Sequence, residues 1–178
     1  MSGLTPSQTV GPYFHIGLDW PDAHRLAGDA TPGTPIVLQG RLLDGDGAAV
    51  PDAMIEIWQA DASGRYGGDA ASGFGGAGRT AVDADGRFAF ETIKPGAVDD
   101  VHGMQAPHVN VAVFARGLLA HLYTRIYFSD ESAANAADPV LACVPAARRE
   151  TLLARREGDA WVLDIHLQGA HETVFFDV

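Results

Sequence analysis

The chain has 178 residues, the length of one ordinary domain, and its 47% hydrophobic and 20% charged residues are typical of a folded globular protein. A formal net charge of −11 argues against nucleic acids and anionic membranes as partners, because both would be repelled. The single cysteine, Cys143, excludes an internal disulfide. Residues Met1–Val10 lack the features of a signal peptide and no apolar run could span a membrane, so we expect a cytoplasmic protein with no nucleic-acid or membrane partner.

Short segments that alternate apolar and polar residues follow one another from residue 36 onward, separated by Gly, Pro and Asp turn signals. In the first of them Ile36, Leu38 and Leu42 share one face, which is typical of a half-buried strand. About seven such segments predict an all-β protein folded as an antiparallel β-sandwich. The expected strands are Ile36–Leu43, Ala53–Gln59, Arg87–Glu91, His108–Arg116, Leu122–Phe128, Trp161–Gln168 and Thr173–Phe176.

Three stretches differ from this pattern. Residues 1–35 are rich in Pro and Gly and carry aromatic residues that are costly to leave in water. We therefore expect an irregular N-terminal arm that packs on its own sandwich or on a partner. Residues 64–78 include seven glycines and predict a long irregular loop. A short helix is expected over Ala146–Arg156, after Pro145 and before Gly158, and one helical turn over Ser132–Ala137.

Several motif-like patterns have ordinary explanations. Residues 73–78 match the glycine pattern of a dinucleotide-binding turn, but that site needs a following helix, and Arg79–Phe90 instead predicts a hairpin. Asp83–Gly86 and Asp44–Gly47 lack the remaining ligands of a calcium loop and indicate tight turns. Cys143 has no basic neighbour that would activate it and is expected to be a small buried residue.

The segment His108–Arg116 carries the most chemical information. On a strand, the small apolar residues at 109, 111, 113 and 115 form one face, which leaves His108, Asn110 and Arg116 together on the other. This polar face fits either a solvated sheet surface or a binding site, and the residues alone favour the solvated surface. Tyr66, in the glycine-rich loop, fits either a packing role or a phenolate ligand for a hard ferric ion.

Motifs in fixed order, covering nearly the whole chain, resemble the intradiol ring-cleavage dioxygenases. The resemblance implies a single domain over residues 1–178 with a transthyretin-like β-sandwich. It also implies a family that opens catechol rings between the two hydroxyls with O₂ and a non-haem ferric ion. The motifs are Val50–Asp61, Gly64–Tyr66, Gly78–Thr80, Thr92–Gly96 and Pro107–His108, with Thr5–Tyr13, Phe114–Gly117, Thr124–Glu131 and Gln168–Asp177 resembling more narrowly an α-type subunit.

The resemblance implies a ligand set of two Tyr and two His for the family's iron, and only half of that set is present. Tyr66 matches the first Tyr and His108 the first His, whereas Asn110 stands at the second His position and Val98 lies near that of the second Tyr. An amide is a poor substitute for imidazole on iron. The resemblance therefore implies a vestigial pair, Tyr66 and His108, with no metal in this chain and no complete catalytic set.

An α-type subunit implies a hetero-oligomer, expected to be large, in which Fe(III) is carried by an iron-bearing β subunit. The shared site would take protocatechuate, a catechol with a carboxylate, and O₂, and would give 3-carboxy-cis,cis-muconate. By resemblance the substrate-binding residues of this chain are Arg116, Thr9, Gly11, Pro12 and Tyr13, and the arm of residues 1–35 lies at the partner interface. A guanidinium suits the carboxylate because it offers forked donors and a permanent charge.

Two alternatives remain open at this point, besides Arg125 as a rival to Arg116 for the carboxylate. The first is a stand-alone binding module on the same sandwich with no enzymatic role. The second is a self-sufficient dioxygenase, which would have to recruit replacement ligands such as Tyr123 or His121.

Overall fold

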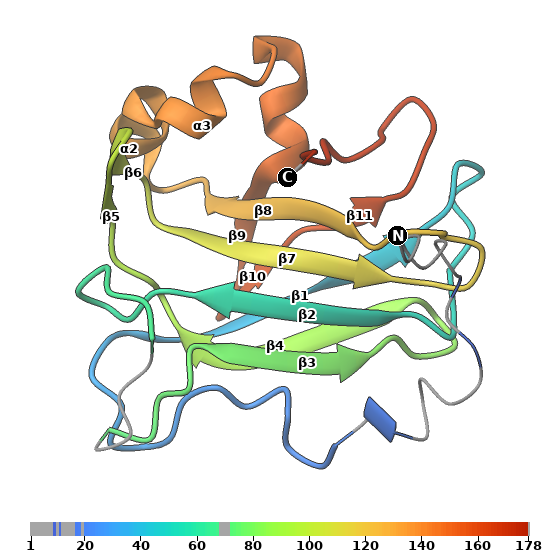
Figure 1. The fold of residues 1–178 in the computed structure, drawn as a ribbon, viewed down its shortest axis with the longest axis horizontal. Coiled ribbons are helices and arrows are strands. Elements are labelled where there is room, and N and C mark those ends of the chain that lie inside the picture. Colours follow the sequence, from blue (N-terminus) through green and yellow to red (C-terminus); the bar gives the residue numbers. More distant parts are fainter. Residues whose placement is uncertain (1–8, 10, 12–16, 19, 68–71, 178) are drawn as a thin grey trace, which may run out of the picture.

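The structure is a computed structural model, and it describes residues 9, 11, 17–18, 20–67 and 72–177. Strands dominate it, so the all-β class is confirmed (Figure 1). A nine-stranded sheet and a separate two-stranded hairpin hold the strands. Strands of the large sheet are β1 (Pro35–Leu43), β2 (Met54–Gln59), β3 (Ala77–Ala81), β4 (Arg87–Ile93), β7 (His108–Phe114), β8 (Leu122–Phe128), β9 (Leu153–Glu157), β10 (Ala160–Val162) and β11 (Ile165–His166); β5 (Val98–Asp100) and β6 (Gly103–Gln105) form the hairpin.

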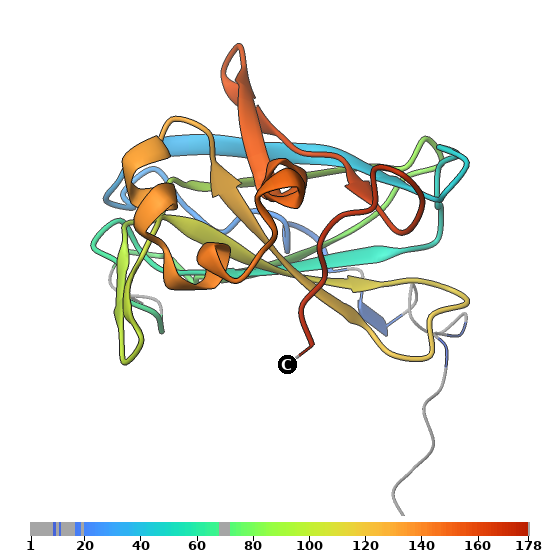
Figure 2. The same cartoon turned by 90° about the horizontal axis from the view of Figure 1, so that it is seen from above.

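The large sheet runs from β4 through β1, β10, β9, β8, β7 and β2 to β3, and β11 pairs with the end of β1 beyond β10. It curls over, so that β1 and β4 lie behind β7 and β2 (Figures 1 and 2). One hydrophobic core fills the space between the two parts and contains residues of both, such as Leu38, Phe90, Ile55 and Val111. A smaller cluster around Tyr127 lies beside the helical segment.

Apolar and polar residues alternate between the buried and the exposed face in the strands where the sequence predicted this pattern. In β7 the residues at 109, 111 and 113 are buried in the core, while Asn110, Ala112 and Phe114 are only partly covered. In β4 Phe88 and Phe90 are buried between exposed neighbours. One face buried and one face solvated is the arrangement that period-two patterning specifies.

Four expectations about the strands were wrong in detail. The sheet is not wholly antiparallel, because β1 pairs in parallel with β10 and β11, and β8 with β9. Trp161–Gln168 is not one strand: the chain is interrupted where the Asp164 carboxylate accepts a hydrogen bond from the Arg41 amide. Thr173–Phe176 holds only an isolated bridge from Phe176 to Tyr123. Arg79–Phe90 is not a hairpin, since β3 pairs with β2 and β4 pairs with β1.

The helix expected over Ala146–Arg156 is half wrong. Residues Ala146–Leu152 form a 3₁₀ helix, η1, but Leu153–Glu157 leaves it to become strand β9. The reason is burial: β9 pairs with both β8 and β10, and Ala154 is fully buried in the core. The expected turn is present as α2 (Ser132–Ala137), followed by α3 (Pro139–Ala142). Cys143, expected to be buried, is exposed after α3.

Part of the N-terminal arm packs on its own sheet. The backbone amide of Arg79 in β3 donates to Ala23, while Glu91 in β4 exchanges hydrogen bonds with His24 and Leu26. The segment therefore bridges the edges of β3 and β4, which do not pair with each other, and buries Leu26 in the core. Contact of residues 1–35 with a partner stays a prediction. Among the described residues no helix is long and apolar enough to cross a membrane.

Candidate functional site

The polar face of β7 begins with His108, whose side chain is 1% exposed. Its Nδ1 lies 2.7 Å from the carbonyl oxygen of Ala106, and a carbonyl can only accept, so Nδ1 carries the proton. In the neutral imidazole Nε2 is then a bare acceptor, and the hydroxyl of Tyr66 lies 3.0 Å from it. The hydroxyl therefore donates to Nε2, the atom that would otherwise be free to bind a metal.

Asn110 completes this contact from the next outward position of β7. Its side-chain amide donates to the Tyr66 hydroxyl at 2.8 Å and to the carbonyl of Trp58 at 3.2 Å. Trp58, on the neighbouring strand β2, also contacts the Tyr66 ring, with centroids 4.3 Å apart. The structure thus brings Tyr66, His108 and Asn110 into one hydrogen-bonded group, which forms a polar pocket and not the solvated sheet surface that the residues alone favoured.

The loop that carries Tyr66 is shaped by an acidic residue and two glycines. The Asp61 carboxylate accepts hydrogen bonds from the amides of Ser63 and Arg65, which closes a tight turn. Gly64 has a φ of +79° and a Cβ there would collide with the carbonyl of Ala97. Gly96 likewise touches this loop, since its amide donates to the Asp61 carbonyl. Tyr66 is therefore held against β7 by a close approach that only glycine permits.

Burial sets the protonation of the group. Desolvation, with the nearby Arg125 guanidinium as a second cause, lowers the pKa of His108 to about 4. Desolvation also raises the pKa of the Tyr66 hydroxyl above its ordinary value, because the charged phenolate would be poorly hydrated there. At neutral pH the pair is consequently a neutral phenol donating to a neutral imidazole.

Supporting residues that sequence reasoning missed hold His108 in place. The carboxylate of Asp138, which is fully buried, accepts from the amide of Ala106, the residue whose carbonyl binds His108. It also accepts from the Tyr127 hydroxyl and caps α3 through the Leu141 amide. The one available signal was the Asp-Pro pair that starts α3, which indicates a cap but not its second role.

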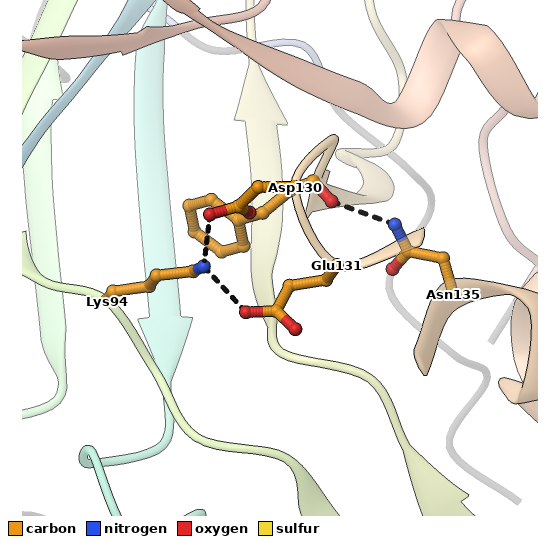
Figure 3. Close-up of polar contacts among 5 residues, drawn as sticks. Lys94, Asp130, Glu131 and Asn135 are labelled. Carbon is orange, nitrogen blue, oxygen red and sulfur yellow. Dashed lines mark hydrogen bonds and ion pairs between the residues drawn. The ribbon is translucent and has the colours of Figure 1, made fainter. Parts of the chain in front are cut away.

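A second missed group fixes the turn after β4. Lys94, partly buried, donates to Asp130 at 2.7 Å and to Glu131 at 2.6 Å (Figure 3). Its ammonium also lies 5.5 Å from the ring centroids of Phe128 and Trp161. These contacts raise the pKa of Lys94 in spite of burial, and they tie the Pro95–Gly96 turn to the end of β8.

The positions that resemble the family's iron ligands do not form an open metal site. Among the described residues no group of three or more His, Cys, Asp or Glu side chains is placed to hold a metal ion. Val98, near the position expected for the second Tyr, is buried at the base of the β5–β6 hairpin. The remaining donors, Tyr66 and His108, are hydrogen-bonded to each other, so this chain offers a ferric ion no open ligand pair.

The expected substrate-binding residues lie elsewhere. Arg116 follows the far end of β7 from His108, about 26 Å away at the rise of a strand. Its side chain is 73% exposed, and among the described residues its guanidinium forms a loose ion pair with Asp52 at 3.5 Å. The adjacent Gly117 amide donates to the Thr9 hydroxyl at 2.8 Å, which brings the arm to Arg116. Gly11 is exposed, whereas Pro12 and Tyr13 lie outside the described residues.

The rivals to these residues are engaged otherwise. Arg125 donates to the side-chain oxygen of Gln105 at 2.9 Å and contacts the Tyr127 hydroxyl, beside the vestigial pair. His121 and Tyr123, the possible replacement ligands, pack edge to face with centroids 4.5 Å apart. Tyr123 faces a shallow groove of about 560 Å³ on the outer side of the sheet, which Trp58 and Asn110 also line.

The comparisons with known proteins agree with this geometry. The sequence model of the dioxygenase family matches residues 10–169, and the chain belongs to that family. The solved dioxygenase domain from Streptomyces sp. SirexAA-E is 30% identical, with a TM-score of 0.65 over 93% of this chain and 99% of that one. The catechol 1,2-dioxygenase of Pseudomonas arvilla C-1, 23% identical with a TM-score of 0.64 over 82% of this chain and 56% of that one, shows the same fold.

Named relatives identify the type of subunit within this family. The chain is 46% identical to the protocatechuate 3,4-dioxygenase alpha chain of Burkholderia cepacia, over 98% of this chain and 97% of that one. It is 47% identical to the alpha chain of Pseudomonas putida, over 97% and 96%. The beta chain of Burkholderia cepacia is less similar, at 35% over 79% of this chain and 67% of that one. The resemblance to an α-type intradiol dioxygenase subunit is thus confirmed.

Proposed function

We propose that this chain is the α subunit of a protocatechuate 3,4-dioxygenase and that it works with an iron-bearing β subunit. The observation that carries the proposal is the 46–47% identity to two alpha chains over almost the whole length of each. The assembled enzyme would cleave protocatechuate with O₂ between its hydroxyls to give 3-carboxy-cis,cis-muconate, in aromatic catabolism. The beta-chain relative at 35% identity supports a partner built on the same fold.

The chain itself carries no iron in this proposal. Its Tyr66 hydroxyl donates to the only free nitrogen of His108, and the pKa shifts of both groups favour their neutral forms. Binding a ferric ion would require removing a proton from a buried phenol and breaking that hydrogen bond, for two ligands instead of four. Fe(III) in the partner would supply the chemistry of ring cleavage, by binding the catecholate and activating it toward O₂.

Substrate orientation is the contribution we assign to this chain. Arg116 is exposed and its ion pair with Asp52 is loose, so its guanidinium is available to a carboxylate that approaches from a neighbouring subunit. Thr9 binds the backbone next to Arg116, so the arm with Gly11, Pro12 and Tyr13 would line the same place. Two chains would then share the positioning of one substrate, which lowers the entropic part of the barrier.

The finer architecture belongs to the same proposal. The curled sheet, with β1 and β4 behind β7 and β2, supports a transthyretin-like sandwich over a single domain of residues 1–178. The arm of residues 1–35 would reach the partner with its first part, while residues 23–26 stay on the sheet. A large hetero-oligomer of the two subunits would result.

The proposal is tested by native purification through a tag on this chain, co-expressed with a β-type subunit of the same family. We expect two polypeptides in equal amounts, one iron per pair, and a visible absorption band from tyrosinate bound to ferric iron. After separation of the subunits, the iron should stay with the partner. A lone, colourless chain would contradict the proposal and would favour a stand-alone binding module.

A further inference from the structure

The β5–β6 hairpin carries an apolar tip that its own fold does not explain. Val101, in the two-residue turn, is 91% exposed, and Met104 on β6 is 56% exposed. Turns of this kind are normally built from Gly, Asn, Asp or Ser, and a β-branched apolar residue at the tip gains nothing locally. The hairpin projects beyond the edge of the main sheet, as the yellow-green segment in Figure 2 shows. Strand β6 lies against α2 and α3, yet the side chains of Val101 and Met104 stay exposed.

The hairpin is nevertheless rigidly supported at its base. Val98 is buried there, and the paired Gln105 is buried opposite it. The Gln105 side chain donates to Asp100 at 2.7 Å and accepts from Arg125 at 2.9 Å, so both strands are fixed to β8. A preorganised projection loses little conformational entropy when it binds, which makes it suited to recognition.

Charge defines the kind of partner. Asp99 is paired across the hairpin with Met104, and both side chains are exposed on the same side. With Asp100 next to the tip, two copies of this hairpin would repel each other, and the net charge of −11 disfavours a second copy of the chain more generally. The occupant that fits is a different chain with an apolar recess and a basic rim.

We propose that the β5–β6 hairpin is a docking element, which inserts Val101 and Met104 into an apolar recess on the iron-bearing partner subunit while Asp99 meets a basic residue at its rim. The proposal rests on the proposed function, because that function supplies the partner. Apolar contact at the tip would hold the complex together, and the acidic flank would speed and orient association.

The test uses the full chain co-expressed with the iron-bearing subunit, with assembly followed by mass photometry during dilution. The double variant Val101→Ser, Met104→Ser should raise the dissociation constant at least 10-fold. Asp99→Asn should mainly slow association and weaken its dependence on salt. The matched control is Glu157→Ser, Asp159→Ser at the tip of the β9–β10 hairpin, which projects to the opposite side of the molecule in Figure 2; it should change the constant less than twofold.

Each outcome separates the two proposals. If the wild-type chain assembles and the tip variant assembles equally well, the docking element is wrong while the α-subunit function stands. If the wild-type chain does not bind a β-type subunit at all, both fall. If the isolated chain forms dimers that the tip variant abolishes, the occupant is a second copy and the proposed partner is wrong.

Discussion

The Tyr66 hydroxyl satisfies two neighbours at once, because it donates to buried His108 and accepts from partly buried Asn110. Tyr66→Phe removes both contacts and leaves a buried imidazole nitrogen without its donor. We expect the free energy of unfolding to fall by about 1–3 kcal/mol, the cost of leaving such groups unsatisfied. Urea denaturation measures this, with Tyr123→Phe, an exposed tyrosine, as the control. Equal stability of the Tyr66 and Tyr123 variants would contradict the hydrogen-bonded group.

The low pKa of His108 makes stability depend on pH. Its folded value is about 4 against an ordinary 6.5, so between pH 7 and pH 5 the unfolded chain takes up a proton that the folded chain does not. The contribution of His108 to the free energy of unfolding is therefore fully present above pH 7 and is lost as the pH falls toward 4. Between pH 7 and pH 5 the free energy of unfolding should fall by about 2 kcal/mol. His108→Gln should flatten that slope in urea titrations run across this pH range, with the wild-type chain as the reference.

We expect the Arg116 guanidinium to bind the carboxylate of the substrate. Arg116→Ala in the assembled enzyme should raise KM for protocatechuate about 10- to 100-fold, the usual cost of losing a charge-assisted hydrogen-bonded pair. The iron absorption band should not change, because Arg116 is not a ligand. Arg155→Ala, an arginine of similar exposure with a loose ion pair, provides the control in steady-state kinetics. An unchanged KM would show that Arg116 does not bind the substrate carboxylate.

At the scale of elements, Lys94 joins the turn after β4 to the end of β8. Lys94→Met keeps the apolar stem but leaves Asp130 and Glu131 adjacent and without their shared cation. Because both carboxylates are partly exposed, we expect a moderate loss of about 1–2 kcal/mol in the free energy of unfolding, smaller at high salt. Thermal denaturation at two salt concentrations, with Arg155→Met for comparison, checks this. A loss that does not respond to salt would show that packing, not charge, is the cause.

Elements were predictable where burial imposes a local period, and not where a distant strand decides. The alternation of 109, 111 and 113 identified β7 and its polar face, since a shift of one residue would expose the core side. Residues 153–157 looked helical because nothing in their own sequence reveals pairing with β8 and β10. The break at Asp164 likewise depends on the Arg41 amide, 123 residues away along the chain.

In the candidate site, too, the features set by a local pattern were predictable and those set by distant contacts were not. Strand alternation placed His108 and Asn110 on one face, and the motif resemblance added Tyr66 to them. Their mutual hydrogen bonds were not predictable, since the sequence gives no orientation for the Tyr66 loop. Asp138 and Lys94 were missed because each acts through contacts with residues more than 30 positions away.

The whole molecule shares one principal core, and this has a consequence for unfolding. Phe90 of β4 is fully buried among residues of β2 and β7 as well as β1, so the two parts of the curled sheet cannot separate without exposing the same cluster. We expect tryptophan fluorescence, which reports buried Trp161, and far-ultraviolet circular dichroism to give one coincident urea transition. Phe90→Ala should lower the free energy of unfolding by about 3–5 kcal/mol and move both transitions together. Transitions that separate in this variant would mean that the two parts of the sheet are stabilised independently.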